Sequence, residues 1–165
     1  MIHFDLDGVC RSLTHHFKEP FLDYNQSVNG MGFCEYIDTD LSLLESAPPT
    51  PYLPIVREYP YINILTCQPE HWRKPTQRWI DEHLCRTNVI YFDSPKDKLA
   101  YLQDRPGDVL VEDYPFFESY KQIVLIDYPY NRCAVAPVRV RTPGELKEVI
   151  WGGGMKIKYE KGEGR

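Results

Sequence analysis

The chain has no excess of basic residues and no closely spaced pair of cysteines. Lysines and arginines number 19 against 24 aspartates and glutamates, which gives a net charge of -5. No basic face is therefore indicated for binding the backbone of a long nucleic acid. The five cysteines stand far apart and are odd in number, so no zinc or redox motif is indicated. We expect reduced thiols in a cytoplasmic protein.

Long hydrophobic runs are absent as well. No apolar stretch is long enough to span a bilayer, and the first residues lack the basic and apolar regions of a signal peptide. We therefore expect no membrane partner. The length of 165 residues suits one compact domain with a small insertion, large enough to bury a core without disulfides.

Five short apolar runs have the length and composition of buried strands, and each ends at polar or turn residues. They cover residues 1–4, 61–65, 88–92, 108–112 and 122–126. Helical patterns occur at 50–59, 74–84, 94–102 and 142–151, the last two with Ser94 and Thr142 as expected N-caps. Glu145 would complete a capping box. Alternating strands and helices predict an α/β fold, a three-layer Rossmann-like parallel sheet with right-handed crossovers.

Residues 11–47 fit no strand-helix-strand unit and are dense in polar and aromatic side chains. We interpret them as a small cap insertion after the first strand, over the carboxyl edge of the sheet where open α/β folds bind ligands. The chain then divides into a core domain of residues 1–10 and 48–165 and a cap of residues 11–47. The Gly- and charge-rich tail at 152–165 is expected to be loosely ordered, or at most a short edge strand.

Polar side chains follow three of the predicted strands. They are Asp5 and Asp7, then Thr66 and Cys67, then Glu112 and Asp113. Because the carboxyl ends of parallel strands meet at one edge of a sheet, we expect these groups to converge. Clustered carboxylates repel one another unless a cation lies among them, and oxygen ligands favour Mg²⁺. Lys98, near the start of the helix before the fourth strand, can reach the same edge.

Together these groups suit phosphoryl transfer. A carboxylate nucleophile can form an aspartyl-phosphate intermediate, while a metal, a lysine and backbone amides neutralise the phosphoryl oxygens. A second carboxylate two residues later can protonate the leaving oxygen and then activate water. Each piece alone has an ordinary structural explanation, since Asp-x-Asp-Gly is common in turns. Their order along the chain, each at the proper end of a strand or helix, favours the catalytic interpretation.

The stretches FDLDGV, ILTCQP and VLVEDYP, with a lysine between the last two, resemble the four motifs of the haloacid dehalogenase-like superfamily. The second aspartate of the first motif is what phosphatase members have. KPTQRWIDEHL and IDYPYNR further resemble the 5'(3')-deoxyribonucleotidase (5'-nucleotidase type C) family, over about residues 2–10 and 52–151. The resemblance implies a Mg²⁺-dependent phosphatase, a phosphoric monoester hydrolase whose expected substrate is a nucleoside 5'-monophosphate or its deoxyribonucleotide.

The resemblance also implies roles for individual residues. Asp5 would be the nucleophile and a Mg²⁺ ligand. Asp7 would be the general acid/base, with its backbone carbonyl on the metal. Thr66, with Cys67 beside it, would bind the transferring phosphoryl group, and Lys98 would pair with that group and with Asp5.

The last acidic pair departs from the family pattern, because Glu112 and Asp113 stand where two aspartates are usual. Asp113 would ligate Mg²⁺ directly or through water, with Glu112 behind it, and the role of Glu112 stays open. Two lysines, Lys96 and Lys98, precede the same apolar residues, and Lys98 fits the family's spacing better.

Several alternatives remain at this point. The substrate could be another small phosphorylated metabolite or a nucleic-acid end, and the chain could be a catalytically idle member that only binds a ligand. Base preference, sugar preference and oligomeric state, a homodimer included, are not set by the sequence. Arg11 and Arg132 could reach substrate or cover the surface, and residues 128–131 favour a turn.

The aromatic residues of the 11–47 segment also have two interpretations. They are Phe17, Phe21, Tyr24, Phe33 and Tyr36. They could stack on a nucleobase, or form the segment's own small core, which we favour for most of them.

Overall fold

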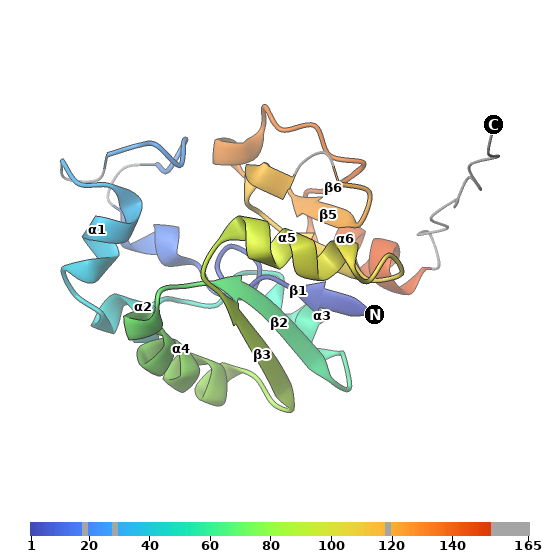
Figure 1. Ribbon diagram of the computed structural model, residues 1–165, viewed down its shortest axis with the longest axis horizontal. Coiled ribbons are helices and arrows are strands. Elements are labelled where there is room, and N and C mark those ends of the chain that lie inside the picture. Colours follow the sequence, from blue (N-terminus) through green and yellow to red (C-terminus); the bar gives the residue numbers. More distant parts are fainter. Residues whose placement is uncertain (18–19, 28–29, 118–119, 153–165) are drawn as a thin grey trace.

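A computed structural model describes residues 1–17, 20–27, 30–117 and 120–152 (Figure 1). Six strands form one parallel sheet in the order β3-β2-β1-β4-β5-β6. The strands are β1 (Ile2–Phe4), β2 (Ile62–Cys67), β3 (Thr87–Phe92), β4 (Val109–Glu112), β5 (Ile123–Ile126) and β6 (Val138–Val140). The expected α/β fold with a parallel sheet is confirmed. The very short β1 lies between β2 and β4, near the middle of the sheet.

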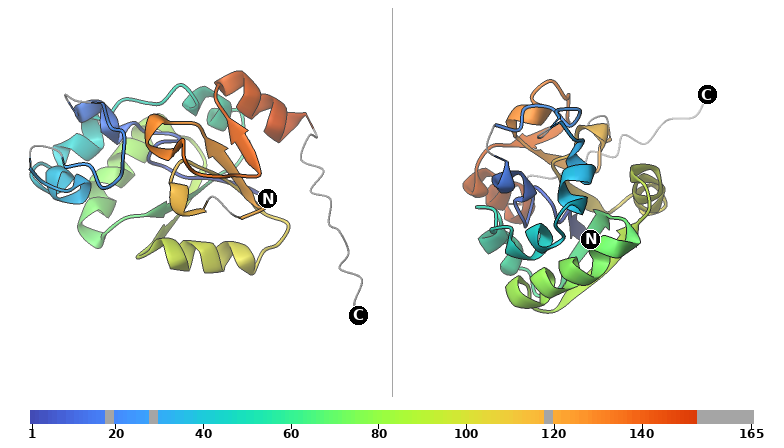
Figure 2. Two further views of the ribbon diagram at one scale, coloured as in Figure 1. Left: turned by 90° about the horizontal axis from the view of Figure 1, so that it is seen from above. Right: turned by 90° about the vertical axis from the view of Figure 1, so that its left-hand side faces the viewer.

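Helices cover both faces of this sheet (Figure 2). They are α3 (Leu53–Arg57), α4 (Glu70–His83) and α6 (Pro143–Trp151) on one face and α5 (Pro95–Gln103) on the other. The larger core joins α3, α4 and α6 to the strands, with Trp79 and Leu146 fully buried. The smaller core packs Leu99 and Leu102 of α5 against the opposite face. The chain therefore steps from β1 outward to β3 and returns across the sheet to β4 through α5.

The predicted helix starts have the expected polar caps. The Ser94 side chain accepts a hydrogen bond from the Asp97 amide, and the Thr142 hydroxyl accepts one from the Glu145 amide at 3.1 Å. The Glu145 carboxylate bonds to the amide of Arg141, one residue before the position that a capping box requires. Both N-cap predictions are therefore confirmed, whereas the box is shifted by one residue.

Three elements differ from the sequence prediction. The helix predicted at 50–59 is the shorter α3, Leu53–Arg57. Helix α4 begins at Glu70 rather than at residue 74, because Trp72 extends the buried stripe that continues through Trp79. The strand β6 is absent from the prediction, since three residues are too few for a period-two pattern to stand out. It is positioned by the hydrogen bond from the Asp127 amide to the Val140 carbonyl, at 2.7 Å.

The segment 11–47, which is described except for 18–19 and 28–29, lies beyond the carboxyl ends of the strands (Figure 1). It contains the 3-10 helix Leu13–His16 and the helices α1 (Phe33–Asp38) and α2 (Ser42–Ser46). A small core of its own is formed by Leu13, Ile37, Leu44 and Ala47, closed by Trp72 of α4. The segment therefore stands at the sheet edge where Asp5 and Asp113 lie.

The remaining features of the chain concern its surface and its end. None of the described helices has the length and apolar character needed to cross a membrane. All five cysteines are free thiols, and only Cys10 is buried. The predicted loose tail falls on residues 153–165, which lie outside the described residues.

Candidate active site

The site begins at the end of β1. The Asp5 amide continues the pairing with β4 by donating to the Val111 carbonyl at 2.8 Å, and the chain then turns away at Leu6. Since β1 lies between β2 and β4, Asp5 projects from the middle of the carboxyl edge. Its side chain is only 9% exposed. A carboxylate is thus held in a nearly dry position at the centre of the sheet edge.

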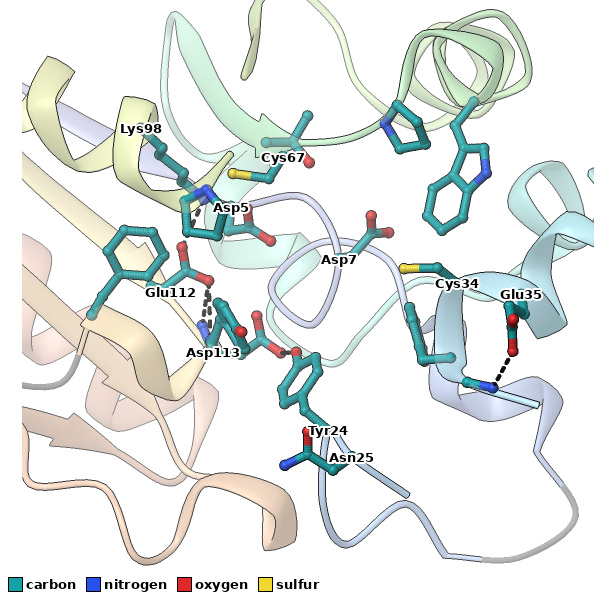
Figure 3. Close-up of a pocket in the computed structure, with 18 residues that line it drawn as sticks. Asp5, Asp7, Tyr24, Asn25, Cys34, Glu35, Cys67, Lys98, Glu112 and Asp113 are labelled. Atoms are coloured by element: carbon teal, nitrogen blue, oxygen red, sulfur yellow. Dashed lines mark hydrogen bonds and ion pairs between the residues drawn. The ribbon is translucent and has the colours of Figure 1, made fainter. Parts of the chain in front are cut away.

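Lys98 reaches this carboxylate from the first turns of α5 (Figure 3). Its ammonium lies 2.5 Å from Oδ1 of Asp5 and 2.7 Å from Oε2 of Glu112. Lys98 is 1% exposed, whereas Lys96 is on the surface. Of the two lysines that the sequence offered, the structure brings Lys98 to the cluster.

Glu112 orients its neighbours with both of its oxygens. Oε2 accepts from Lys98, and Oε1 accepts from the backbone amides of Asp113 and Tyr114 at 3.0 and 3.1 Å. Glu112 has one methylene more than an aspartate, and with that length it bonds to the two amides of the turn after β4. This geometry favours the position behind the metal ligands that the resemblance implied for Glu112.

Asp113 is held by two tyrosines. Its Oδ2 accepts from the hydroxyl of Tyr24 at 3.0 Å and from that of Tyr130 at 2.5 Å. The segment 128–131 was expected to form a turn, and it does form the 3-10 helix Pro129–Asn131, but it also supplies Tyr130 to the site. Asn131 bonds to the Asp113 carbonyl at 2.7 Å. The turn composition of this stretch gave no sign of the contact between Tyr130 and Asp113. That contact depends on the packing of β5 beside β4.

Gly8 lies directly against Asp113. Its φ is +88°, and a Cβ atom there would stand 2.2 Å from Cγ of Asp113. Glycine is required here for two reasons. L side chains avoid this φ, and the carboxyl group of Asp113 occupies the space that a Cβ atom would need. The Gly8 carbonyl also accepts from the Tyr128 hydroxyl at 2.8 Å.

Asp7 is gripped by two side chains that sequence reasoning did not assign to it. Arg11 donates from Nε to Oδ1 at 2.7 Å, and Gln68 donates to Oδ2 at 2.6 Å. Arg11 is fully buried. The interpretation that Arg11 covers the surface is therefore wrong, and Arg11 is not among the residues that line the cavity described below, whereas Arg132 is exposed. The spacing of four residues between Asp7 and Arg11 was the available signal, but in a loop that spacing has no fixed meaning.

The surroundings of the cluster disfavour the ionised forms of its carboxylates. Burial first, and then the charge of Glu112, raise the pKa of Asp5 to about 8, although Lys98 opposes the shift. Burial and the same glutamate raise the pKa of Asp113 well above its ordinary value. Burial lowers the pKa of Lys98, but Asp5 and Glu112 outweigh it, so this pKa is raised.

Asp5, Glu112 and Asp113 each offer a carboxylate oxygen, and these oxygens lie within 4.8 Å of one another. With Lys98 among them, the ionised cluster carries two negative charges in excess, which a divalent cation balances. Hard oxygen donors of this kind fit Mg²⁺. Asp5 and Asp113 are the better placed ligands, because both oxygens of Glu112 already accept hydrogen bonds.

A cavity of about 490 Å³ opens over the cluster, with walls from the sheet edge and the 11–47 segment (Figure 3). Asp5, Asp7, Thr66, Cys67, Lys98, Glu112 and Asp113 all line it. Every candidate from the sequence is therefore brought to one place. Burial raises the pKa of the Cys67 thiol to about 12, so this thiol stays neutral and is no nucleophile.

Aromatic rings form much of the remaining wall. They belong to Tyr24, Phe33, Trp72, Tyr114 and Phe117. Of the five aromatics predicted in the 11–47 segment, only Tyr24 and Phe33 are among the lining residues. The others pack ring to ring beside them, for instance Phe17 on Phe33 at a centroid distance of 5.5 Å. Most of these aromatics thus have the packing role that we favoured.

In the presence of EDTA, the free energy of unfolding is expected to fall as pH rises from 3.8 to about 8. Over this range Asp5 keeps its proton in the folded protein but loses it in the unfolded chain, so folding takes up a proton. Each unit of pKa difference corresponds to about 1.4 kcal/mol. Mg²⁺ needs ionised ligands, so its stabilising effect grows with pH over the same range.

Urea unfolding at several pH values, with Mg²⁺ and with EDTA, measures both slopes. Asp5→Asn serves as the control, since it removes the contribution of Asp5 and leaves only that of Asp113. Stability that rises with pH in EDTA across this range would contradict the raised pKa of the cluster.

Neither a scan against protein-family models nor a search of curated proteins finds a match for this chain. The site consists of Lys98 between the buried carboxylates of Asp5 and Glu112, with Asp113 beside them. Asp7, held by Arg11, lines the same cavity.

Proposed function

We propose that this protein is a Mg²⁺-dependent phosphatase of the haloacid dehalogenase-like type, which hydrolyses a phosphomonoester through an aspartyl-phosphate at Asp5. The observation that carries the proposal is the contact of Lys98 with Asp5 and Glu112, next to Asp113, at one edge of a parallel sheet. This cluster gives a nucleophile, a charge that pairs with phosphate, and a divalent cation site. The 11–47 segment is then the cap over that site.

The first half of the reaction transfers the phosphoryl group to the protein. An oxygen of Asp5 attacks phosphorus, the bond between phosphorus and the leaving oxygen breaks, and Asp7 gives its proton to that oxygen. Lys98 holds Asp5 in place and pairs with the phosphoryl oxygens, and the buried Thr66 hydroxyl lies in the same cavity wall to donate to them.

The second half returns the protein to its starting state. Asp7 takes a proton from water as the water oxygen attacks phosphorus, and Asp5 leaves as a carboxylate while inorganic phosphate is released. Asp5 and Asp113 would hold Mg²⁺, which would neutralise part of the phosphoryl charge when bound. Tyr24 and Tyr130 keep the Asp113 carboxylate from rotating away.

The cavity supports a small substrate with a single phosphate group. Among the described residues that line it, Lys98 is the only lysine or arginine, so a second phosphate would meet carboxylates without a cation of its own. Its volume lies within the range of small-molecule sites. Tyr24, Phe33 and Trp72 belong to the cavity wall, and an aromatic wall suits an aromatic base. These features favour a nucleoside 5'-monophosphate.

Phosphate release from a panel of substrates tests this proposal. The panel contains ribo- and deoxyribonucleoside 5'-monophosphates, nucleoside diphosphates, sugar phosphates and a 3'-phosphorylated oligonucleotide. We expect the monophosphates to be turned over fastest, the diphosphates poorly, and all turnover to stop in EDTA. Activity that survives EDTA would overturn the metal-dependent mechanism, and faster turnover of sugar phosphates or the oligonucleotide would reassign the substrate.

Two lysine variants provide a matched control for the same assay. Lys98→Met is expected to lose turnover because Asp5 and the phosphoryl group both lose their cation. Lys96→Met removes the same charge from the surface of the same helix turn and is expected to behave like the wild-type protein. Equal effects of the two substitutions would contradict the role of Lys98. A protein that binds nucleotide but releases no phosphate would instead be a catalytically idle member of this fold.

A further inference from the structure

Arg11 is a fully buried arginine whose guanidinium grips Asp7. Nε lies 2.7 Å from Oδ1 of Asp7, and a terminal nitrogen lies 3.2 Å from Oδ2, so the two side chains meet as a fork. Both oxygens of Asp7 are thereby fixed. Such bidentate pairs restrict orientation as well as supplying energy.

The other bonds of Arg11 hold the guanidinium away from the cavity. The second terminal nitrogen donates to the Leu44 carbonyl of α2 at 2.7 Å. Both terminal nitrogens lie 3.3 Å from the Thr76 hydroxyl of α4, and the guanidinium lies 5.6 Å from the centre of the Trp79 ring. With its donors directed in this way, Arg11 does not line the cavity. It contacts Asp7 and not the reacting atoms.

Gln68 adds a second grip on the same carboxylate. Its amide nitrogen lies 2.6 Å from Oδ2 of Asp7, and the residue is 2% exposed. Its Oε1 is buried and has no hydrogen-bond partner among the described residues. An unpaired buried acceptor is destabilising, because it has lost its hydrogen bonds to water. Among the described residues, the Gln68 side chain therefore forms its hydrogen bond with Asp7.

We propose that Arg11, assisted by Gln68, is a positioning residue that fixes Asp7 for its two proton transfers. The inference rests on the proposed function, in which Asp7 protonates the leaving oxygen and later activates water. A free aspartate on a loop samples several rotamers, whereas proton transfer needs the carboxylate at hydrogen-bond distance from the reacting oxygen. The fork gives Asp7 one orientation before substrate arrives.

The test compares two substrates that differ in their need for a proton. The leaving group of p-nitrophenyl phosphate departs as a stable anion, whereas that of a nucleoside 5'-monophosphate must be protonated. In Arg11→Met, turnover of the monophosphate is expected to fall by about 10²-fold or more. The first release of p-nitrophenolate is expected to stay within about 10-fold of wild type, because it needs no general acid.

The second proton transfer gives a further signature. Water activation also depends on Asp7, so the phosphoenzyme of Arg11→Met is expected to accumulate. Stopped-flow mixing with p-nitrophenyl phosphate then shows a burst of nitrophenolate close to one equivalent of protein, followed by slow turnover. A protein that was only partly folded would instead show a smaller burst in proportion to its loss of activity.

Two more variants make the experiment decisive. Arg78→Met is the matched control, because Arg78 also joins α4 to α2, through Glu45 at 2.6 Å, but does not touch Asp7. It is expected to retain both activities. Gln68→Met removes one donor from Asp7 together with the unpaired acceptor, so it is expected to fold well and to show the same burst with a smaller loss. If Arg11→Met does not fold, Gln68→Met decides.

Two results would overturn the inference alone. One is equal loss on both substrates without a burst in folded Arg11→Met, and the other is an unchanged ratio of the two activities in both Arg11→Met and Gln68→Met. Failure of the wild-type protein to release phosphate from either substrate would be a different outcome. It would overturn the proposed function first, and the positioning role with it.

Discussion

Asp5→Asn is expected to abolish phosphate release, by at least about 10³-fold, while leaving the protein folded. An amide of the same shape cannot attack phosphorus, so neither turnover nor a burst of p-nitrophenolate is expected. Lys98 keeps its bond to Glu112 at 2.7 Å, so the cluster is not left with an unpaired ammonium. Because burial and Glu112 disfavour the ionised form of Asp5, the variant is expected to be at least as stable as wild type in EDTA.

Beryllium fluoride with Mg²⁺ provides an independent readout for the same variant. It mimics a phosphoryl group on a carboxylate, so it is expected to raise the melting temperature of the wild-type protein and not that of Asp5→Asn. Asp93→Asn is the matched control, since Asp93 lies on the surface beside Arg73 and makes no contact with the cluster. If Asp5→Asn kept a tenth or more of wild-type activity, the nucleophile would have to be sought elsewhere.

Gly8→Ala is expected to destroy metal binding and activity and to destabilise the fold by about 2–5 kcal/mol. Its Cβ would overlap the carboxyl group of Asp113, which cannot retreat because it is buried and held by Tyr24 and Tyr130. The positive φ adds strain of about 1–2 kcal/mol for any L side chain. Urea unfolding and the Mg²⁺-induced thermal shift measure the two effects.

Gly30→Ala separates the two causes. Gly30 has a φ of +81°, nearly the value at Gly8, but no atom of the described residues outside its chain neighbours lies within 4 Å of the Cβ that alanine would introduce. This variant is expected to lose only the backbone term of about 1–2 kcal/mol and to keep its activity. Were Gly8→Ala no more harmful than Gly30→Ala, Asp113 would have to be free to move, and its proposed place as a metal ligand would weaken.

Much of the fold was predictable because its signals are local. Parallel strands buried on both faces appear as short apolar runs, and the N-caps at Ser94 and Thr142 are written in two or three residues. The strand β6 carries no such signal. Its position depends on β5 beside it, which no local pattern reveals.

The residues of the candidate site were likewise predictable only where the signal was local. Asp5, Asp7 and Asp113 could be brought together from sequence because each follows a strand, and strand ends share an edge. The contacts that hold them could not. Arg11 was expected at the surface or on substrate, yet it is buried against Asp7, and Tyr130 lay in a stretch with turn composition. Both depend on how a loop closes over its neighbours, which spacing along the chain does not determine.

The brevity and central place of β1 have a consequence for how the candidate site forms during folding. Phe4 pairs with Ile64 of β2 on one side, and the three residues of β1 pair with Val109, Leu110 and Val111 of β4 on the other, all distant along the chain. Such pairing joins residues far apart in sequence. The chain therefore loses loop-closure entropy before the hydrogen bonds and packing of the strand can stabilise it. The strand that presents Asp5 therefore cannot form ahead of its partners. We therefore expect Asp5, the proposed nucleophile, to reach its position only when β2 and β4 are both in place.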